Sequence, residues 1–129
     1  MVCKDIYNGA LYTLGDGCIS DTRAKEYEER APYLIAAFCC EASSLDVHYR
    51  QALGLVEQKE FTPVSIALSD EFPLSDRFFA PAVNYLASML ISDENGDLSD
   101  KLFSRCCDAL ATIHVELPMT ASKIKNMYI

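Results

Sequence analysis

Apolar residues recur every three or four positions over the first fourteen residues, which is the spacing of one face of a helix. These positions are Val2, Ile6, Tyr7, Ala10, Leu11 and Leu14. Gly15 and Gly17 follow, and a glycine after the last periodic residue commonly ends a helix because it accepts the left-handed conformation. The pattern therefore predicts a first helix from Val2 to Leu14.

A second helical pattern begins at Ser20 or Asp21, and either side chain can cap the first turn of a helix. Its inward positions are Tyr27, Ala31, Leu34, Phe38, Leu45, Tyr49 and Ala52. Pro32 lacks an amide hydrogen and clashes with the preceding turn, so we expect it to kink or restart the helix. Gly54 is the expected stop.

Residues 64–68 follow a different pattern, in which Val64, Ile66 and Leu68 alternate with smaller residues. Such alternation is typical of a short half-buried strand or an extended arm. Prolines bracket the stretch, and a proline at the border of a strand suits a sheet edge. Its unpaired backbone groups can form a local hairpin with residues 54–61 or pair with a neighbouring subunit by strand addition.

Three further helical patterns complete the chain. Ser75 or Asp76 caps a strongly apolar helix over residues 77–91, and another apolar stripe runs from Leu98 to Ile113. Pro118 ends that stripe, and a last short helix is expected over residues 119–128.

The order of these elements predicts one mainly α domain over residues 1–129, a length that suits a single core. We expect a helical bundle of four to five helices, with one extended arm or short β-hairpin between helices two and three.

The charge balance narrows the classes of partner. Asp and Glu outnumber Lys and Arg by 19 to 11, for a net charge of −8. Tight binding to nucleic acid or to anionic membranes needs a surplus of basic residues, so we expect neither as a partner. No signal peptide is visible, and no apolar run approaches the roughly 20 residues that span a bilayer. These features predict a protein made in the cytoplasm.

The six cysteines include two adjacent pairs, Cys39–Cys40 and Cys106–Cys107, inside helical patterns. Adjacent cysteines lack the two-to-four-residue spacer of zinc sites, and only His48 and His114 could add imidazole ligands. Without a secretory signal, reduced thiols in the core are expected. We therefore expect no metal.

The stretch "SDENGDLSD", residues 92–100, resembles the start of a calcium-binding loop because Asp93, Asn95 and Asp97 alternate. The glycine and the bidentate glutamate that such a loop needs do not follow at their positions. Asn95 or Gly96 can instead end one helix in the left-handed conformation, and Asp97 or Ser99 can cap the next. We interpret the stretch as the turn of a helical hairpin.

Catalytic motifs are missing from the sequence. It contains no nucleophile elbow, no zinc-protease helix and no glycine-rich phosphate loop. His48 and His114 each lie two residues from an acid, but residues i and i+2 on a helix do not face each other. We expect surface or capping histidines, no catalytic residue, no cofactor and no enzymatic activity.

Residues 72–110 resemble the small helical head–tail connector, or neck adaptor, proteins of tailed bacteriophages and prophages. Those proteins often show an "FPLPDRF"-like stretch, an apolar helix of the type A-x-x-Y-x-L-A-x-x-L, an acidic turn and a further helix. The counterparts here are Phe72–Phe78, then Ala82, Tyr85, Leu86, Ala87 and Leu90, then Asp93–Asp97, then Leu98, Leu102 and Cys106. The tyrosine often found in the last helix is replaced by Cys106 or Cys107.

The resemblance implies a non-enzymatic structural protein that self-associates into a ring between the phage portal and the tail or other neck proteins. Such a protein would lie in the cytoplasm of the host bacterium during assembly and then in the virion. The residues expected at subunit or partner contacts are Phe61, Val64, Ile66, Leu68 and Phe72 of the arm, and Met127, Tyr128 and Ile129 at the end of the chain. The alternative is a small acidic helical module that binds or regulates a basic protein.

Overall fold

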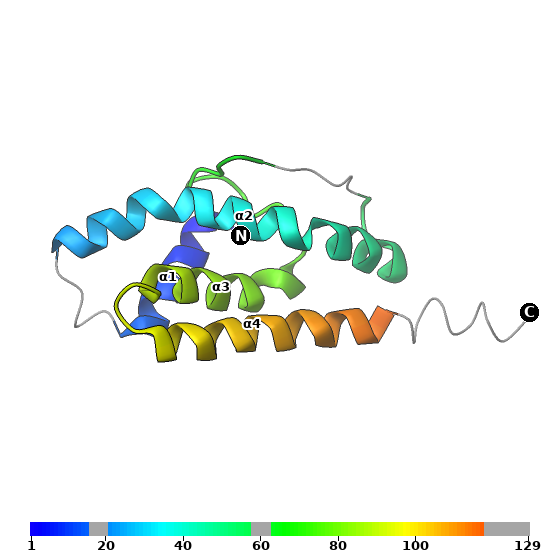
Figure 1. The fold of residues 1–129 in the computed structure, drawn as a ribbon. Helices are drawn as coiled ribbons and strands as arrows, with labels where there is room; N and C mark the ends of the chain where they lie inside the picture. Colours follow the sequence, from blue (N-terminus) through cyan, green and yellow to red (C-terminus); the bar gives the residue numbers. More distant parts are fainter. Residues whose placement is uncertain (16–20, 58–62, 118–129) are drawn as a thin grey trace, which may run out of the picture.

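Four α-helices account for most of residues 1–15, 21–57 and 63–117, which are the residues that the structure, a computed structural model, describes (Figure 1). The helices are α1 (Cys3–Leu14), α2 (Asp21–Leu53), α3 (Phe79–Ile91) and α4 (Gly96–Leu117), and a short 3-10 helix, η2 (Asp76–Phe78), precedes α3. The prediction of a mainly α fold is confirmed. The helix expected over residues 119–128 lies outside the described residues.

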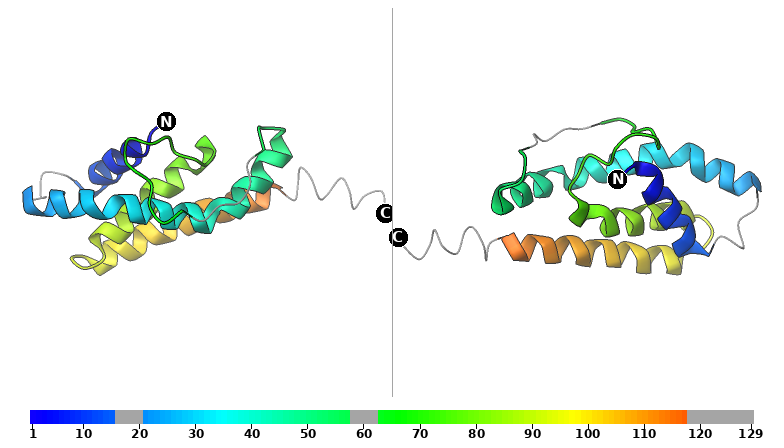
Figure 2. Two further views of the ribbon diagram at one scale, coloured as in Figure 1. Left: turned by 90° about the horizontal axis from the view of Figure 1, so that it is seen from above. Right: turned by 180° about the vertical axis from the view of Figure 1, so that it is seen from behind.

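Helix α3 occupies the centre of the molecule and packs against α1, α2 and α4. It runs opposite to α4, to which a short turn joins it, and α2 runs in the same direction as α4 (Figure 1). Viewed from behind, α1 and α3 lie in front of α2 and α4 (Figure 2). Helices α2 and α4 therefore form an outer layer of the protein, with α3 behind the junction between them.

The sequence of α3 explains its central place, because apolar and small residues surround most of the helix. The buried residues of α3 are Pro81, Ala82, Tyr85, Leu86, Ala87, Ser88 and Leu90. Where α1 crosses α3, a Cβ on Gly9 would approach a methyl carbon of Val83 to 3.2 Å. The small residue at position 9 thus allows the two helices to pack closely.

Helix α2 has the expected bounds and continues through Pro32. It runs unbroken through Pro32, so the expectation of a restart there is wrong, and its 33 residues span about 50 Å. Gly15 and Gly54 end α1 and α2 in the left-handed conformation, with φ of 76° and 68°, and both predicted stops are confirmed.

The glycine at the end of α2 gives the first testable prediction. Gly54→Ala should lower the free energy of unfolding by about 1–2 kcal/mol, because a Cβ disfavours the left-handed conformation although the space around it is open. Gly96→Ala is the matched control, since Gly96 is helical and equally unobstructed. Urea denaturation of the two variants tests this, and equal stability for both would contradict it.

Residues 63–73 do not form the predicted strand. The described residues contain no strand, and the segment makes only an isolated bridge between Val2 and Glu71. Its carbonyl groups at Leu68 and Asp70 instead accept hydrogen bonds of 2.8 and 2.9 Å from the amides of Lys4 and Cys3. The first turn of a helix has amides without helical partners, and this segment supplies their acceptors for α1.

The turn between α3 and α4 confirms the predicted helical hairpin but not its predicted geometry. Neither Asn95 nor Gly96 adopts the left-handed conformation. The Asn95 carboxamide oxygen accepts a 3.1 Å hydrogen bond from the Leu98 amide, so Asn95 caps α4 in place of Asp97 or Ser99. Deeper in the hairpin, the buried Ser88 and Ser99 each donate a hydroxyl hydrogen bond to the other's carbonyl, at 2.8 and 2.9 Å.

Candidate interaction surfaces

The predicted contact residues of the arm separate into two groups. Ile66 and Phe72 are buried in the core of their own chain, and Leu68 is partly buried against it. Val64 is 82% exposed. The other predicted contact residues, Phe61, Met127, Tyr128 and Ile129, lie outside the described residues. Of the described arm residues, Val64 presents the most surface to a partner.

The backbone of the arm is also engaged within its own chain. The amide of Ile66 donates a 3.1 Å hydrogen bond to the carbonyl of Pro32 in α2, and the amide of Phe72 donates one of 2.8 Å to the carbonyl of Met1. With the bonds to α1, these contacts fix residues 66–72 across the first halves of α1 and α2. Strand addition at residues 66–72 would have to break them.

A buried carboxylate fixes the other side of the segment that joins α2 to α3. Asp46 of α2 is only 1% exposed, and one of its oxygens accepts hydrogen bonds from the amide and the hydroxyl of Ser75, at 3.0 and 2.6 Å. Its other oxygen lies 2.9 Å from Nε of Arg50. The hydroxyl of Ser75 therefore does not cap the following helix, which corrects the prediction for that residue.

Arg50 extends this network to both ends of the connecting segment. Its two terminal nitrogens donate hydrogen bonds of 3.1 and 3.2 Å to the carbonyls of Val56 and Pro73. A buried ion pair is favourable only when further hydrogen bonds satisfy both partners, and this pair has them. Asp46, Arg50 and Ser75 thus hold the start and the end of the segment against α2.

Three exposed apolar side chains lie where this segment leaves α2. They are Leu53, Leu55 and Val56, and we call them the loop patch. Val64 is also exposed, but it lies apart from them, since the neighbouring Pro63 carbonyl accepts a hydrogen bond from Cys40 in the middle of α2. Val56 is 82% exposed although its backbone carbonyl is held by Arg50. A group of neighbouring exposed apolar side chains is typical of a contact surface, and an anchored backbone lowers the entropy lost on binding.

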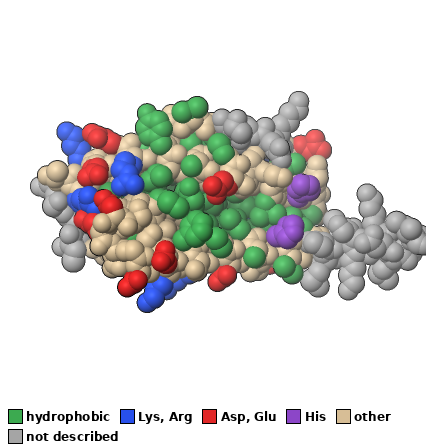
Figure 3. Space-filling view, viewed as in Figure 1, with side chains coloured by type: hydrophobic (Ala, Val, Ile, Leu, Met, Phe, Trp, Pro, Cys, Tyr) green, Lys and Arg blue, Asp and Glu red, His purple; other side chains and the backbone are tan. Residues whose placement is uncertain are grey.

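A second apolar surface covers the junction of α2 and α4, where Figure 3 shows hydrophobic side chains gathered across both helices. Its partly buried or exposed residues are Leu34 and Leu45 of α2 and Phe103 and Leu110 of α4, and we call this surface the α2–α4 face. Phe38 of α2 and Tyr85 of α3 are buried beside them. Aromatic contacts connect these three helices, with ring centroids of Phe38 and Tyr85 5.6 Å apart and those of Tyr85 and Phe103 6.5 Å apart. Phe103 is 40% exposed.

One acidic residue stands within this apolar face. Glu41 follows Phe38 by three positions and precedes Leu45 by four, so it lies on the same side of α2. Burial raises the pKa of the Tyr85 hydroxyl, and the nearby Glu41 carboxylate raises it further. The Glu41 side chain is exposed and forms no ion pair with another described residue.

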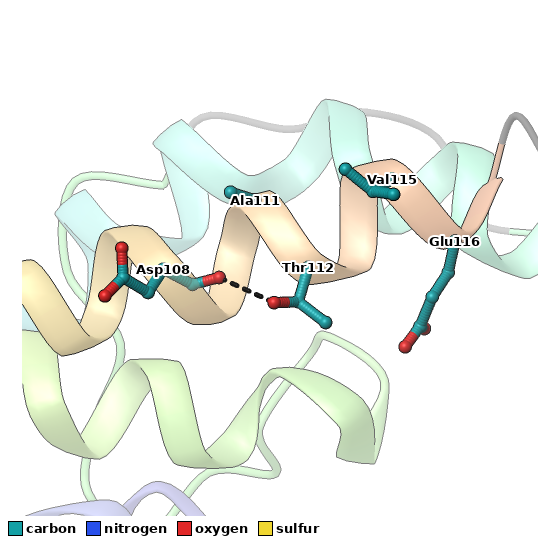
Figure 4. Close-up of a pocket in the computed structure, with 5 residues that line it drawn as sticks. All are labelled: Asp108, Ala111, Thr112, Val115 and Glu116. Atoms are coloured by element: carbon teal, nitrogen blue, oxygen red, sulfur yellow. Dashed lines mark hydrogen bonds between the residues drawn. The ribbon is translucent and has the colours of Figure 1, made fainter.

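The last two turns of α4 carry a shallow groove on their outer side. Asp108, Ala111, Thr112, Val115 and Glu116 line it. Figure 4 shows Ala111 and Val115 on the α2 side of the helix and Thr112 and Glu116 on the α3 side, and the Thr112 hydroxyl donates a 2.9 Å hydrogen bond to the Asp108 carbonyl. The groove has carboxylates at its two ends and apolar carbon between them.

Two side chains of α2 bind the carboxylates of the turn between α3 and α4. Nitrogen atoms of Arg23 lie 3.1 Å from Asp93 and 2.7 Å from Glu94, and the buried Tyr27 donates a 3.2 Å hydrogen bond to Glu94. The Arg23 guanidinium also stacks 5.3 Å above the Tyr27 ring. The stretch that resembled a calcium loop therefore ties the hairpin to the start of α2.

The pKa of Asp93 predicts how this contact depends on pH. Partial desolvation opposes ionisation, but the hydrogen bond and charge of Arg23 hold the pKa of Asp93 below its ordinary value. A lowered folded-state pKa stabilises the fold above pH 4, and this stabilisation is lost as the pH falls through the folded-state value. Asp93→Asn should therefore lower the melting temperature at pH 7 and leave it unchanged near pH 2. A pH-independent difference would contradict this.

The cysteines follow the prediction of core thiols in part. Cys3, Cys39 and Cys106 are buried, and burial raises their pKa values to about 11, 12 and 12. Cys107 is exposed, because adjacent residues on a helix point about 100° apart and only one of each pair can face the core. Cys18 lies outside the described residues.

The described residues offer no grouping of the kind that holds a metal ion, namely three or more His, Cys, Asp or Glu side chains together. His48 and His114 are both exposed, as expected, and Nδ1 of His48 lies 2.8 Å from the Ser44 carbonyl oxygen. Figure 3 shows both histidines at one end of the α2–α4 face.

Within residues 1–15, 21–57 and 63–117, no helix has the length and apolar character to cross a membrane.

Sequence reasoning identified the arm but missed two features of these surfaces. Asp46 was considered only as a neighbour of His48, although its spacing of four from Arg50 signals a helical ion pair. The α2–α4 face was assigned to the core, because periodicity marks apolar positions without showing which of them another helix covers.

No protein-family model, curated protein or solved structure matches this chain.

Proposed function

We propose that this chain is a structural subunit of the head–tail connector type, which assembles with copies of itself into a ring between a phage portal and a tail. The observation that carries the proposal is that one small helical fold presents two unlike apolar surfaces, the loop patch and the α2–α4 face. When two different surfaces of identical subunits bind each other, the copies join head to tail, and a suitable rotation closes them into a ring.

The resemblance to connector proteins supports the same function. Its residues, 72–110, form one continuous unit here, made of η2, α3, the acidic turn and most of α4. The matched positions Ala82, Leu86, Leu90, Leu102 and Cys106 are all buried. The resemblance therefore concerns the residues that build the hairpin, while the loop patch lies outside them and the α2–α4 face lies partly outside them.

The net charge of −8 fits a ring through which DNA passes. A surface rich in carboxylates repels the phosphate backbone, so DNA would move through such a channel without adhering to it. The two apolar surfaces, by contrast, bring few charges together, which limits the repulsion between identical acidic subunits.

The loop patch gives a direct test of this function. Val56→Glu places a charge on a side chain that is 82% exposed, so the fold should persist while the contact between subunits is lost. Tyr12→Glu is the matched control, because Tyr12 is 84% exposed on α1, away from both surfaces. Sedimentation velocity should show large assemblies for the unchanged protein and for Tyr12→Glu, and monomers for Val56→Glu. Equal behaviour of the two variants would contradict the proposal.

The second candidate function is an acidic module that binds a basic protein. It is favoured by Glu41, which is exposed on α2 and forms no ion pair within the described residues. Capture of partners on the full-length protein separates the two functions. Portal, tail or neck proteins, together with further copies of the chain, support the connector function. A single strongly basic host protein, without self-association, supports the binding module and contradicts the ring.

A further inference from the structure

The α2–α4 face is an apolar surface with a single carboxylate near its middle, and its chemistry specifies a partner. Phe103 is exposed, and Leu34, Leu45 and Leu110 are only partly buried. Apolar side chains of a partner would cover the surface that these four residues leave open to solvent. Glu41, which has no ion pair within the described residues, would be neutralised by a cation brought against it. The expected occupant is therefore an apolar segment that carries lysine or arginine.

The last twelve residues of the chain have this composition. Residues 118–129, "PMTASKIKNMYI", hold two lysines and no acid, whereas the chain as a whole has a net charge of −8. Their apolar side chains are Met119, Ile124, Met127, Tyr128 and Ile129, and the lysines stand on either side of Ile124. Residues 118–129 thus complement the α2–α4 face in both hydrophobicity and charge.

We propose that the α2–α4 face of one copy binds residues 118–129 of a neighbouring copy, with Lys123 and Lys125 placed around Glu41. This inference rests on the proposed ring function and specifies one of its contacts. Helix α4, which precedes residues 118–129 in the sequence, ends at the same end of the molecule as α2 (Figure 1). Twelve residues reach at most about 40 Å, which is enough to extend along a neighbour's helices.

Charge reversal tests the proposed pairing in the full-length protein. Glu41→Lys should raise the concentration for half-maximal assembly about tenfold, since it turns an attraction into a repulsion. Lys123→Glu with Lys125→Glu should have a similar effect. Glu29→Lys is the matched control, because Glu29 is exposed on the same helix and the charge change is identical.

Combining the variants distinguishes contacts between copies from contacts within one chain. An equimolar mixture of Glu41→Lys protein and Lys123→Glu/Lys125→Glu protein should assemble as well as the unchanged protein, because each copy then meets a complementary neighbour. Recovery only when all three changes are in one chain would show that residues 118–129 bind their own chain, which overturns the proposal.

The remaining outcomes separate this inference from the proposed function. If the unchanged protein assembles and Glu41→Lys behaves like Glu29→Lys, the ring function stands and the proposed contact is overturned. If the unchanged protein stays monomeric at every concentration, both are overturned. A synthetic peptide of residues 118–129 provides an independent check, since it should compete with the neighbouring copy and reduce assembly, while the same peptide with both lysines replaced by glutamate should not.

Discussion

Asp46→Ala is expected to lower the free energy of unfolding by about 3–5 kcal/mol, because it breaks a buried ion pair and leaves one charge uncompensated. The substitution removes the acceptor of both Ser75 hydrogen bonds and the charge that faces Arg50. The guanidinium then remains at a largely buried position without its counter-ion. Urea denaturation followed by circular dichroism measures the loss.

Two variants separate the role of the charge from that of local packing. Ser75→Ala removes one hydroxyl donor and should cost about 1 kcal/mol. Asp76→Ala changes an exposed carboxylate one residue further along and should stay within about 0.5 kcal/mol of the unchanged protein. If Asp46→Ala resembled Asp76→Ala, the network would not hold the connecting segment. Faster hydrogen exchange at the Leu55 amide, which bonds to the Arg50 carbonyl, in Asp46→Ala would show directly that the loop patch has lost its anchor.

Phe78→Ala is expected to have a comparable effect, with a loss of about 3–5 kcal/mol. Phe78 is fully buried at the start of α3, and its ring meets the edge of Tyr49 with centroids 5.9 Å apart and planes at 88°. An edge-to-face pair of this kind adds to the free energy of burial itself. Truncation would open a cavity where α2 and α3 join.

The neighbouring Phe79 is the control for Phe78. Phe79 is only partly buried, so Phe79→Ala should cost clearly less than Phe78→Ala under the same denaturation conditions. If Phe78→Ala fails to fold, Phe78→Leu keeps most of the volume and should cost about 1–1.5 kcal/mol. A larger loss for Phe79→Ala than for Phe78→Ala would contradict the packing described for this end of α3.

Helix positions were predictable because local periodicity and glycine stops report on them directly. The expected start of α1 at Val2 differs from the observed start by one residue, its expected end at Leu14 agrees with the observed end, and Gly54 ends α2 as predicted. The apolar run that became α3 also signalled its central position, since a helix with apolar residues on most sides must be covered on most sides.

The segment between α2 and α3 was not predictable from its local pattern. Alternation at Val64, Ile66 and Leu68 indicated a strand, yet its carbonyl groups are used by the amides of α1, more than sixty positions earlier in the chain. A pattern within five residues contains no information about amides elsewhere in the chain that need hydrogen-bond acceptors. The arm prediction placed both Ile66 and Val64 on a partner, whereas the structure buries Ile66 and leaves Val64 exposed.

Two further features could not be predicted from the local sequence pattern: the residue that caps α4, and the exposure of the α2–α4 face. Asn95 was assigned a backbone role, but its side chain reaches the Leu98 amide and caps α4. Leu34, Phe38 and Leu45 were correctly predicted as one apolar stripe of α2. Because α1 and α3 both lie on the far side of α2 and α4, part of that stripe stays exposed, and only the tertiary arrangement shows it (Figure 2).

The central claim, that copies of this chain assemble head to tail into a ring, is tested most directly by electron microscopy of the purified full-length protein over a range of concentrations. Two unlike surfaces on each subunit predict closed rings with a single rotational symmetry, which disappear in Val56→Glu and persist in Tyr12→Glu. Particles that remain monomeric, or that stop at two-fold dimers in which each copy uses the same surface, would contradict the claim.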